Sequence, residues 1–235
     1  MCRNAERVIE RTIRSVLDQD YATIEYIIID GASTDQTMQI VRQWEARISR
    51  VISEPDIGIF DAMNKGVQNA SGDFLLFLNA GDFLIHSSAI SSVVRLIREK
   101  GLHEVDVISA RLLVYNPNGE ARIWTPRQAS QLSFYHGSLP HPSTFQNKKA
   151  FHKIGLFDPC LKIAGDYEWF VRGFANALQF HILDILTTVF INDGISASIE
   201  WNSTQRKEIE LVRARYFSHR FWLNIGRFLR KNKIL

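Results

Sequence analysis

The sequence predicts an α/β fold with a mostly parallel sheet and helices on both faces. Short apolar runs alternate with segments of helical periodicity along the first half of the chain, which is typical of a parallel sheet with crossover helices. Two of these runs, residues 26–29 and 74–78, stop at small-residue turns that carry Asp30 and Asp82. Because the carboxyl ends of parallel strands meet at one edge of a sheet, we expect both aspartates at that edge.

The individual elements follow from local patterns. Helices are predicted where apolar residues recur every three to four positions, and strands where short apolar runs are bounded by turn residues. In chain order we expect a helix over 5–17, a strand over 24–29, a helix over 36–44, a strand over 50–53, a helix over 57–70, a strand over 74–78, a helix over 88–100 and a strand over 105–110. Residues 114–119, Val-Tyr-Asn-Pro-Asn-Gly, predict a hairpin turn, so mixed structure is expected after residue 110.

The bulk composition predicts a globular protein of the cytoplasm. The 235 residues are 46% hydrophobic and 23% charged, which are ordinary values for a chain that buries one substantial core. The two cysteines, Cys2 and Cys160, are too few for a disulfide framework and fit a reducing compartment. No apolar segment has the length of a membrane span, and the start lacks the apolar core of a signal peptide.

Positive charge is concentrated at the end of the chain. Residues 206–235 carry nine Lys or Arg and two Glu, so the remainder of a chain with net charge +3 is acidic. We therefore divide the chain into a main α/β domain over 1–200 and a basic, amphipathic helical tail over 201–235. The tail suits either peripheral contact with an anionic membrane or packing on the domain with a solvated basic face, and the sequence favours neither.

Several short motifs occur in a fixed order along residues 2–195. They are Asn4-Ala5-Glu6, residues 30–35 (Asp-Gly-Ala-Ser-Thr-Asp), Asn64-Lys65-Gly66, residues 79–82 (Asn-Ala-Gly-Asp), residues 141–145 (His-Pro-Ser-Thr-Phe) and residues 164–167 (Ala-Gly-Asp-Tyr). This set resembles the family 2 glycosyltransferases of the GT-A fold, and residues 53–66 are most similar to members that build bacterial exopolysaccharide of the colanic-acid type. The resemblance implies a Rossmann-like sheet and transfer of a sugar from a nucleotide diphosphate to an acceptor hydroxyl.

The resemblance implies nucleotide-binding roles for four residues. Asp30 is expected to bind a ring N–H of the base, although a helix-capping turn is the alternative. Asn64 and Lys65 are expected near the diphosphate, but an ordinary ion pair between Lys65 and Asp61 explains the pattern equally well. Gly81 stands where the family usually has an acidic residue, and glycine there allows a close approach of backbone to nucleotide.

Asp82 is the expected metal ligand. Hard Mg²⁺ or Mn²⁺ takes carboxylate and diphosphate oxygens, and it neutralises charge on the departing diphosphate. The departure at Gly81 removes the second carboxylate of the family's usual pair and places metal affinity in question. A plain turn residue is the alternative role for Asp82.

Asp166 is the expected general base, and an N-cap of the following helix is the alternative. Displacement at the anomeric carbon needs one carboxylate opposite the leaving group, so the resemblance implies an inverting enzyme. His141 is expected on the acceptor side or at the metal, with a structural role equally open.

The start of the chain departs from the family pattern. Family members have a strand that ends where Cys2-Arg3-Asn4 stands, whereas here helical spacing begins almost at Met1. We therefore expect the first strand of the sheet, about six residues, to be missing. Either the recorded start lies downstream of the true one or the product is impaired by a gap in its sheet.

The sequence thus favours an inverting glycosyltransferase in bacterial surface-polysaccharide biosynthesis, cytoplasmic or peripheral on the inner face of the membrane. Its expected partners are a nucleotide-sugar donor and a saccharide or lipid-linked saccharide acceptor. A non-catalytic or truncated nucleotide-sugar binder is the first alternative. A sugar-phosphate nucleotidyltransferase is the second, but its N-terminal Gly-rich loop is absent. None of the thirteen glycines forms G-x-G, and neither a Walker loop, a G-x-S-x-G elbow nor a nucleic-acid module is present.

Overall fold

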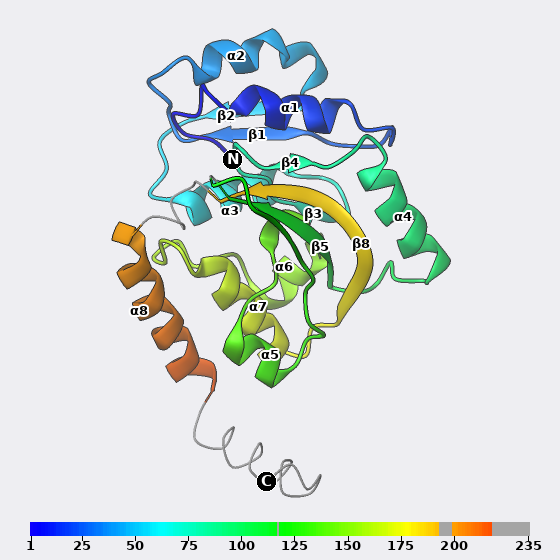
Figure 1. Ribbon diagram of the computed structural model, residues 1–235, viewed down its shortest axis with the longest axis vertical. Coiled ribbons are helices and arrows are strands. Elements are labelled where there is room, and N and C mark those ends of the chain that lie inside the picture. The colour runs from blue at the N-terminus through cyan, green and yellow to red at the C-terminus, as the bar shows by residue number, and fades with distance from the viewer. Residues whose placement is uncertain (117, 193–198, 218–235) are drawn as a thin grey trace, which may run out of the picture.

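The computed structural model describes residues 1–116, 118–192 and 199–217, and it contains two sheets (Figure 1). A two-stranded sheet pairs β1 (Ile27–Asp30) with β2 (Arg50–Ser53). The second sheet has six strands in the order β3-β7-β5-β8-β4, with β6 paired to β5. These strands are β3 (Phe74–Leu76), β4 (Phe83–Leu84), β5 (Val107–Tyr115), β6 (Ala121–Trp124), β7 (Thr144–Asn147) and β8 (Phe180–Ile191).

Strand directions are mixed. The pairs β1–β2 and β5–β8 are parallel, whereas β3–β7, β5–β7, β4–β8 and β5–β6 are antiparallel. The parallel character predicted for the first half is found in β1–β2, and the mixed structure expected after residue 110 extends over the whole second sheet. The long strand β8 curves around this sheet from β5 to β4 (Figure 1).

Helices cover both faces of the second sheet, as predicted. The α-helices of the described residues are α1 (Ile9–Leu17), α2 (Thr37–Gln43), α3 (Ile59–Asn69), α4 (Ala89–Glu99), α5 (Gln131–His136), α6 (Lys148–Ile154), α7 (Gly165–Ala175) and α8 (Ile199–Tyr216). Of these, α4 covers one face of the second sheet and α6 and α7 the other, whereas α1 and α2 lie beside the two-stranded sheet (Figure 1). Successive strand residues point to opposite faces. Ile108 accordingly packs with Val93 of α4, while Val107 belongs to the core that Trp169 and Phe170 of α7 fill from the other side.

The predicted elements all form, with shifted ends. The first helix begins at Ile9 because residues 5–8 make a turn that is held by side chains of the 33–37 loop, for example the Thr37 hydroxyl accepting from Ala5 N at 2.7 Å. The strand predicted over 105–110 continues to Tyr115, because its second half pairs with both β6 and β8. The hairpin predicted at 114–119 joins β5 to β6.

Met1 and Cys2 lie between the two sheets and connect them. Cys2 N donates to Ile29 O, and Gly31 N donates to Cys2 O, both at 2.9 Å. On the other side Met1 N donates to Leu78 O at 2.7 Å. Cys2 thus forms an isolated parallel bridge with Asp30 of β1, at the place where the first strand is expected to be missing.

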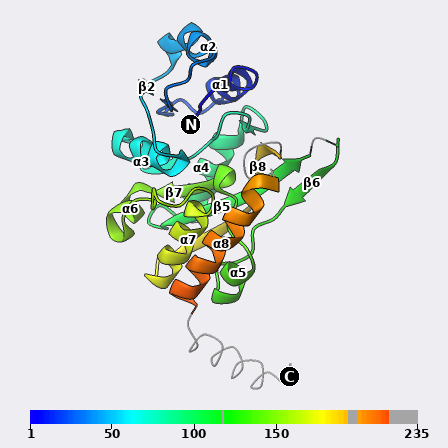
Figure 2. The same cartoon turned by 90° about the vertical axis from the view of Figure 1, so that its left-hand side faces the viewer.

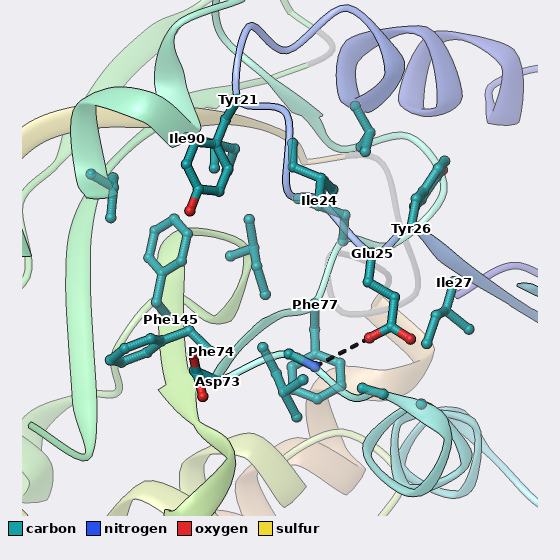
Figure 3. A pocket seen from close by; sticks show the side chains of 18 of the residues that line it. Tyr21, Ile24, Glu25, Tyr26, Ile27, Asp73, Phe74, Phe77, Ile90 and Phe145 are labelled. Atoms are coloured by element: carbon teal, nitrogen blue, oxygen red, sulfur yellow. Dashed lines mark hydrogen bonds between the residues drawn. The ribbon is translucent and has the colours of Figure 1, made fainter. Parts of the chain in front are cut away.

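A cavity of about 700 Å³ lies between β1 and β3, and Met1 and Cys2 are among the residues that line it. Apolar side chains line it, among them Ile24, Ile27, Phe74 and Phe77 (Figure 3). Among the described residues β1 and β3 have no neighbouring strand on their facing edges other than the bridge at Cys2. The cavity is a gap in the sheet layer.

The C-terminal helix α8 lies against the body of the molecule (Figure 2). Tyr216 donates its hydroxyl hydrogen to Glu168 of α7 at 2.7 Å, and Arg213 donates to the Tyr135 carbonyl at 2.5 Å. The amphipathic pattern predicted for 216–234 lies outside the described residues from position 218 onward. No helix within the described residues combines the length and the apolar character needed to cross a bilayer.

Candidate active site

Asp166 lies in the first turn of α7, where it meets His141. The Asp166 Oδ2 atom is 3.4 Å from His141 Nδ1, and His141 Nε2 is 3.1 Å from the Asn79 amide nitrogen. With its proton on Nδ1, His141 donates to Asp166 and accepts from Asn79, which satisfies both ring nitrogens. The side chains of Asp166 and His141 are 19% and 21% exposed, so a ligand can reach the carboxylate. The structure thus brings together two residues predicted on the acceptor side.

The start of α7 is fixed by close packing and by a buried carboxylate. A Cβ at Gly165 would lie 2.6 Å from the Phe60 ring, so glycine lets α7 approach α3. Glu208 of α8 is 7% exposed and accepts from three backbone N–H groups. These belong to Lys162, Ile163 and Ala164, at 2.7, 2.9 and 2.8 Å, directly before α7. Sequence reasoning missed Glu208, because its position in a basic tail gave no signal of contact with residue 166.

Asp82 lies in the turn after β3 and is 3% exposed. Gly81 has a φ of +109°, a conformation that favours glycine. The Thr12 hydroxyl of α1 holds the turn by donating to Asp82 O at 2.8 Å and accepting from Gly81 N at 3.0 Å. Burial raises the pKa of the Asp82 carboxyl to about 7.

Unpaired oxygens at this turn fit a hard cation. Asp82 Oδ2 and Asn79 Oδ1 are both buried without a hydrogen-bond partner among the described residues. Buried polar atoms are rarely left unpaired unless an ion, water or ligand binds them. No group of three His, Cys, Asp or Glu side chains that could hold a metal is found within the described residues. The oxygens therefore fit Mg²⁺ or Mn²⁺ when diphosphate oxygens supply further ligands.

Asp30 ends β1 on the two-stranded sheet and is fully buried. Its Oδ1 accepts from the Ser33 hydroxyl at 2.5 Å, and its Oδ2 accepts from the Ser53 hydroxyl at 2.7 Å. A Cβ at neighbouring Gly31 would lie 2.2 Å from Asp56 Oδ2, so glycine allows the Asp56 side chain to pack closely against this loop. Asp30 thus organises the turn, and its contact with a base stays a prediction.

Asn64 and Lys65 make protein contacts on α3. The Asn64 amide pairs with Phe157, donating to its carbonyl and accepting from its N–H, both at 2.9 Å. Lys65 Nζ lies 2.9 Å from Glu54 and 3.7 Å from Asp61, so the ion pair with Asp61 that the sequence left open is present. The hydrogen bond that Lys65 donates to the Glu54 carboxylate raises the Lys65 pKa. The nucleotide contacts of both residues stay predictions.

These positions separate into two groups. Asp166, His141, Asn79 and the turn of Asp82 lie together where β3, the 3₁₀ turn His141–Ser143 and α7 meet. Asp30 lies across the gap on the other sheet. Through His141, the partly exposed carboxylate of Asp166 is thus connected to Asn79, whose Oδ1 is unpaired, and Asp82, which also has an unpaired oxygen, lies three residues further on.

Comparison with known proteins identifies the class of this chain. Residues 1–161 match glycosyl transferase family 2, so the chain belongs to that family. An uncharacterized glycosyltransferase of Mycobacterium tuberculosis is 34% identical over 168 residues, which are 70% of this chain and 63% of the relative. A PGL/p-HBAD biosynthesis glycosyltransferase of Mycobacterium bovis is 26% identical over 177 residues, covering 74% of this chain and 67% of that protein.

Solved structures confirm the GT-A fold. TarS 1–349 of S. aureus, crystallised with UDP-GlcNAc, matches with a TM-score of 0.68 at 21% identity. The match covers 89% of this chain and 64% of that one. The mannosyltransferase PcManGT of Pyrobaculum calidifontis, in complex with GDP-Man and Mn²⁺, matches with a TM-score of 0.68 at 15% identity, covering 91% and 61% of the two chains.

Proposed function

We propose that this protein transfers a sugar from a nucleotide-diphosphate donor to an acceptor hydroxyl with inversion at the anomeric carbon. The observation that carries the proposal is the contact of Asp166 with His141 beside the unpaired oxygens of Asn79 and Asp82. One accessible carboxylate and one hard-oxygen cluster match the two requirements of a single displacement, a base for the acceptor and a site for the diphosphate.

Asp166 acts as the base in this proposal. Its carboxylate takes the proton of the acceptor hydroxyl while the acceptor oxygen bonds to the anomeric carbon. The bond from that carbon to the diphosphate oxygen breaks, and the electron pair leaves with the nucleoside diphosphate. His141 orients the carboxylate through Nδ1, and Asn79 fixes the imidazole through Nε2. Because no second carboxylate is needed as a nucleophile, the product has the inverted configuration.

Asp82 and Asn79 would hold the divalent cation with their unpaired oxygens. A bound Mg²⁺ or Mn²⁺ neutralises negative charge on a diphosphate leaving group. A structural neighbour that binds Mn²⁺ together with GDP-Man supports this role. The Asp82→Asn variant should lose the part of donor affinity that depends on Mn²⁺, measured by calorimetry with and without chelator. Nucleotide binding by the parent that is equally tight in chelator would contradict the metal assignment.

We further propose that the acceptor is a saccharide or lipid-linked saccharide of a bacterial surface polysaccharide. Two relatives support this class by name, the PGL/p-HBAD biosynthesis enzyme and the poly(ribitol-phosphate) beta-N-acetylglucosaminyltransferase TarS, which is 24% identical over 191 residues. Peripheral membrane contact by the basic tail depends on residues outside the described part of the chain. Sedimentation with phosphatidylglycerol vesicles tests that contact.

A transfer assay with a panel of nucleotide sugars tests the function. Thermal shift first selects the donor, and proton NMR of the product then compares its anomeric configuration with that of the donor. We expect a β-linked product from an α-linked donor. Retention of configuration would contradict the single displacement.

A non-catalytic nucleotide-sugar binder is the second candidate, because the gap between β1 and β3 and the glycine at position 81 both weaken a donor site. Donor binding without transfer or donor hydrolysis would favour it. Pyrophosphate release from a nucleoside triphosphate and a sugar 1-phosphate would instead indicate a nucleotidyltransferase.

A further inference from the structure

A surface hollow of about 490 Å³ lies where the end of β6 faces α5 and the chain that follows it. Trp124, Arg127, His136 and Ser138 are among its lining residues, and the Trp124 side chain is 39% exposed. Figure 2 shows the hairpin of β5 and β6 that carries Trp124 projecting from the body of the molecule. Ligand sites combine an aromatic surface with a few convergent polar groups, which is the composition of this hollow.

Three polar side chains that line the hollow, those of Arg127, His136 and Ser138, make no hydrogen bond within the described part of the chain, whereas Ser133 bonds to Gln128 and Ser130. Arg127 makes neither a hydrogen bond nor an ion pair there, and the ring nitrogens of His136 make no hydrogen bond. The Ser138 hydroxyl is buried and has no hydrogen-bond partner. No Asp or Glu is found among the residues that line the hollow. Arg127 is thus a cation without a carboxylate partner among the lining residues, and the Ser138 hydroxyl and the His136 ring can each donate a hydrogen bond beside it, which favours an anionic ligand.

Two connections place this hollow beside Asp166. Ser138 is three residues before His141, so the two Cα atoms are at most about 11 Å apart. The carbonyl of Phe134, another lining residue, accepts from the Tyr167 hydroxyl at 2.8 Å, and Tyr167 is the neighbour of Asp166. A ligand in the hollow therefore lies near the segment that carries His141 and near the start of α7.

We propose that this hollow binds an anionic sugar unit of the acceptor, which rests on the proposed transferase function. The exposed face of Trp124 stacks on the sugar ring, since an aromatic side chain offers a large apolar surface with a polar edge. Arg127 binds the phosphate or carboxylate of that unit, and His136 and Ser138 add neutral donors. The site selects charged over neutral saccharides.

Fluorine NMR of protein labelled with 5-fluorotryptophan tests the proposal, and the Trp124→Phe variant assigns the resonance. Glucose 6-phosphate and glucuronate are titrated in separate arms to distinguish phosphate from carboxylate recognition, with neutral glucose in a third. We expect a saturable shift of the Trp124 signal with at least one of the two anions and a response to glucose at least 10-fold weaker. The same shift should occur in the Asp166→Asn variant, so that binding is measured independently of transfer.

Arg127→Gln should abolish the response to the anion. Arg122→Gln on the same hairpin is the matched control, since Arg122 is exposed but does not line the hollow, and it should respond as the parent does. A Trp124 signal that does not move with either anion overturns the proposal, as does an equal shift with glucose or an undiminished response in Arg127→Gln. A shift with UDP as strong as with the sugar anions would identify the hollow as a nucleotide site and also overturn it.

Discussion

The two-stranded sheet of β1 and β2 and the six-stranded sheet of β3 to β8 differ in how their layers are completed. The larger sheet has α4 on one face and the core of α6 and α7 on the other. The smaller sheet is joined to it by the backbone of Met1 and Cys2 and by side chains of α1 such as Thr12, while a cavity separates β1 from β3. Asp166, the proposed general base, lies beside the larger sheet. Asp30, the expected contact to the nucleobase, lies on the smaller sheet next to the cavity.

This difference separates the proposed general base and diphosphate site from the proposed nucleobase contact at Asp30. Asp166, His141 and Asn79 are held by contacts that do not cross the gap, including the buried carboxylate of Glu208. Asp30 and its loop depend on the position of the small sheet, which the gap leaves less supported. We therefore expect loosening of the small sheet to lower the free energy of unfolding and the nucleotide affinity, while the position of the Asp166 carboxylate is kept.

Filling the gap should have the largest effect on stability. An extended strand of about six apolar, β-branched residues fused to Met1 would pair with the free edges of β1 and β3 and bury their apolar side chains. We expect the free energy of unfolding to rise by roughly 3 kcal/mol or more and nucleotide binding to tighten. Urea denaturation of the fused and parent proteins measures the change.

A proline-rich extension of equal length is the matched control, because it cannot form the ladder hydrogen bonds. If the parent and the strand-bearing protein have equal free energies of unfolding, the added strand does not stabilise the contact between the two sheets, and this prediction is wrong.

Replacing one carboxylate oxygen of Glu208 should have the next largest effect on stability, and it should also lower the turnover number. In Glu208→Gln the side-chain amide group faces backbone N–H groups of the loop before α7, and we expect a loss of about 1 to 3 kcal/mol in stability. The turnover number should fall while donor affinity stays constant, because the change acts through the position of Asp166. Glu210→Gln on the exposed side of the same helix provides the comparison. If both variants lose equal stability and rate, the carboxylate of Glu208 has no special role.

The smallest effect concerns the reactivity of the two cysteines. Cys2 is buried between the sheets, and burial raises the pKa of its thiol to about 12, so the reactive thiolate is scarce at pH 8. Cys160 is exposed. We expect iodoacetamide at pH 8 to modify Cys160 at least roughly 10-fold faster, with sites assigned by peptide mass spectrometry. Comparable rates would mean that the Met1–Cys2 segment leaves its place readily.

The pattern of the sequence predicts the elements better than their pairing. Apolar periodicity placed the helix at 88–100 and the strand at 50–53 close to their observed ends. It could not show that β7 inserts antiparallel between β3 and β5, because this register depends on residues about 70 positions apart, such as Leu75 and Gln146. Periodicity describes neighbours along the chain, whereas sheet order is set by distant partners.

The candidate site shows the same limit. The motif resemblance predicts roles for Asp166, His141 and Asp82, and the structure adds the contacts that join Asp166 to His141 and His141 to Asn79. The pairing of Asn64 with the backbone of Phe157 spans 93 residues and leaves no local signature. Glu208 was assigned to a basic tail by charge alone, and charge does not show which carboxylate is buried.

The most direct test of the central claim compares Asp166→Asn with the parent protein. The variant keeps the size of the side chain but cannot accept the acceptor proton, so transfer should fall by roughly 10²-fold or more while calorimetry finds donor binding unchanged. Asp184→Asn, at an aspartate whose side chain is 87% exposed, should transfer at the parent rate. Parent-level transfer by Asp166→Asn would remove Asp166 from the mechanism and contradict the account.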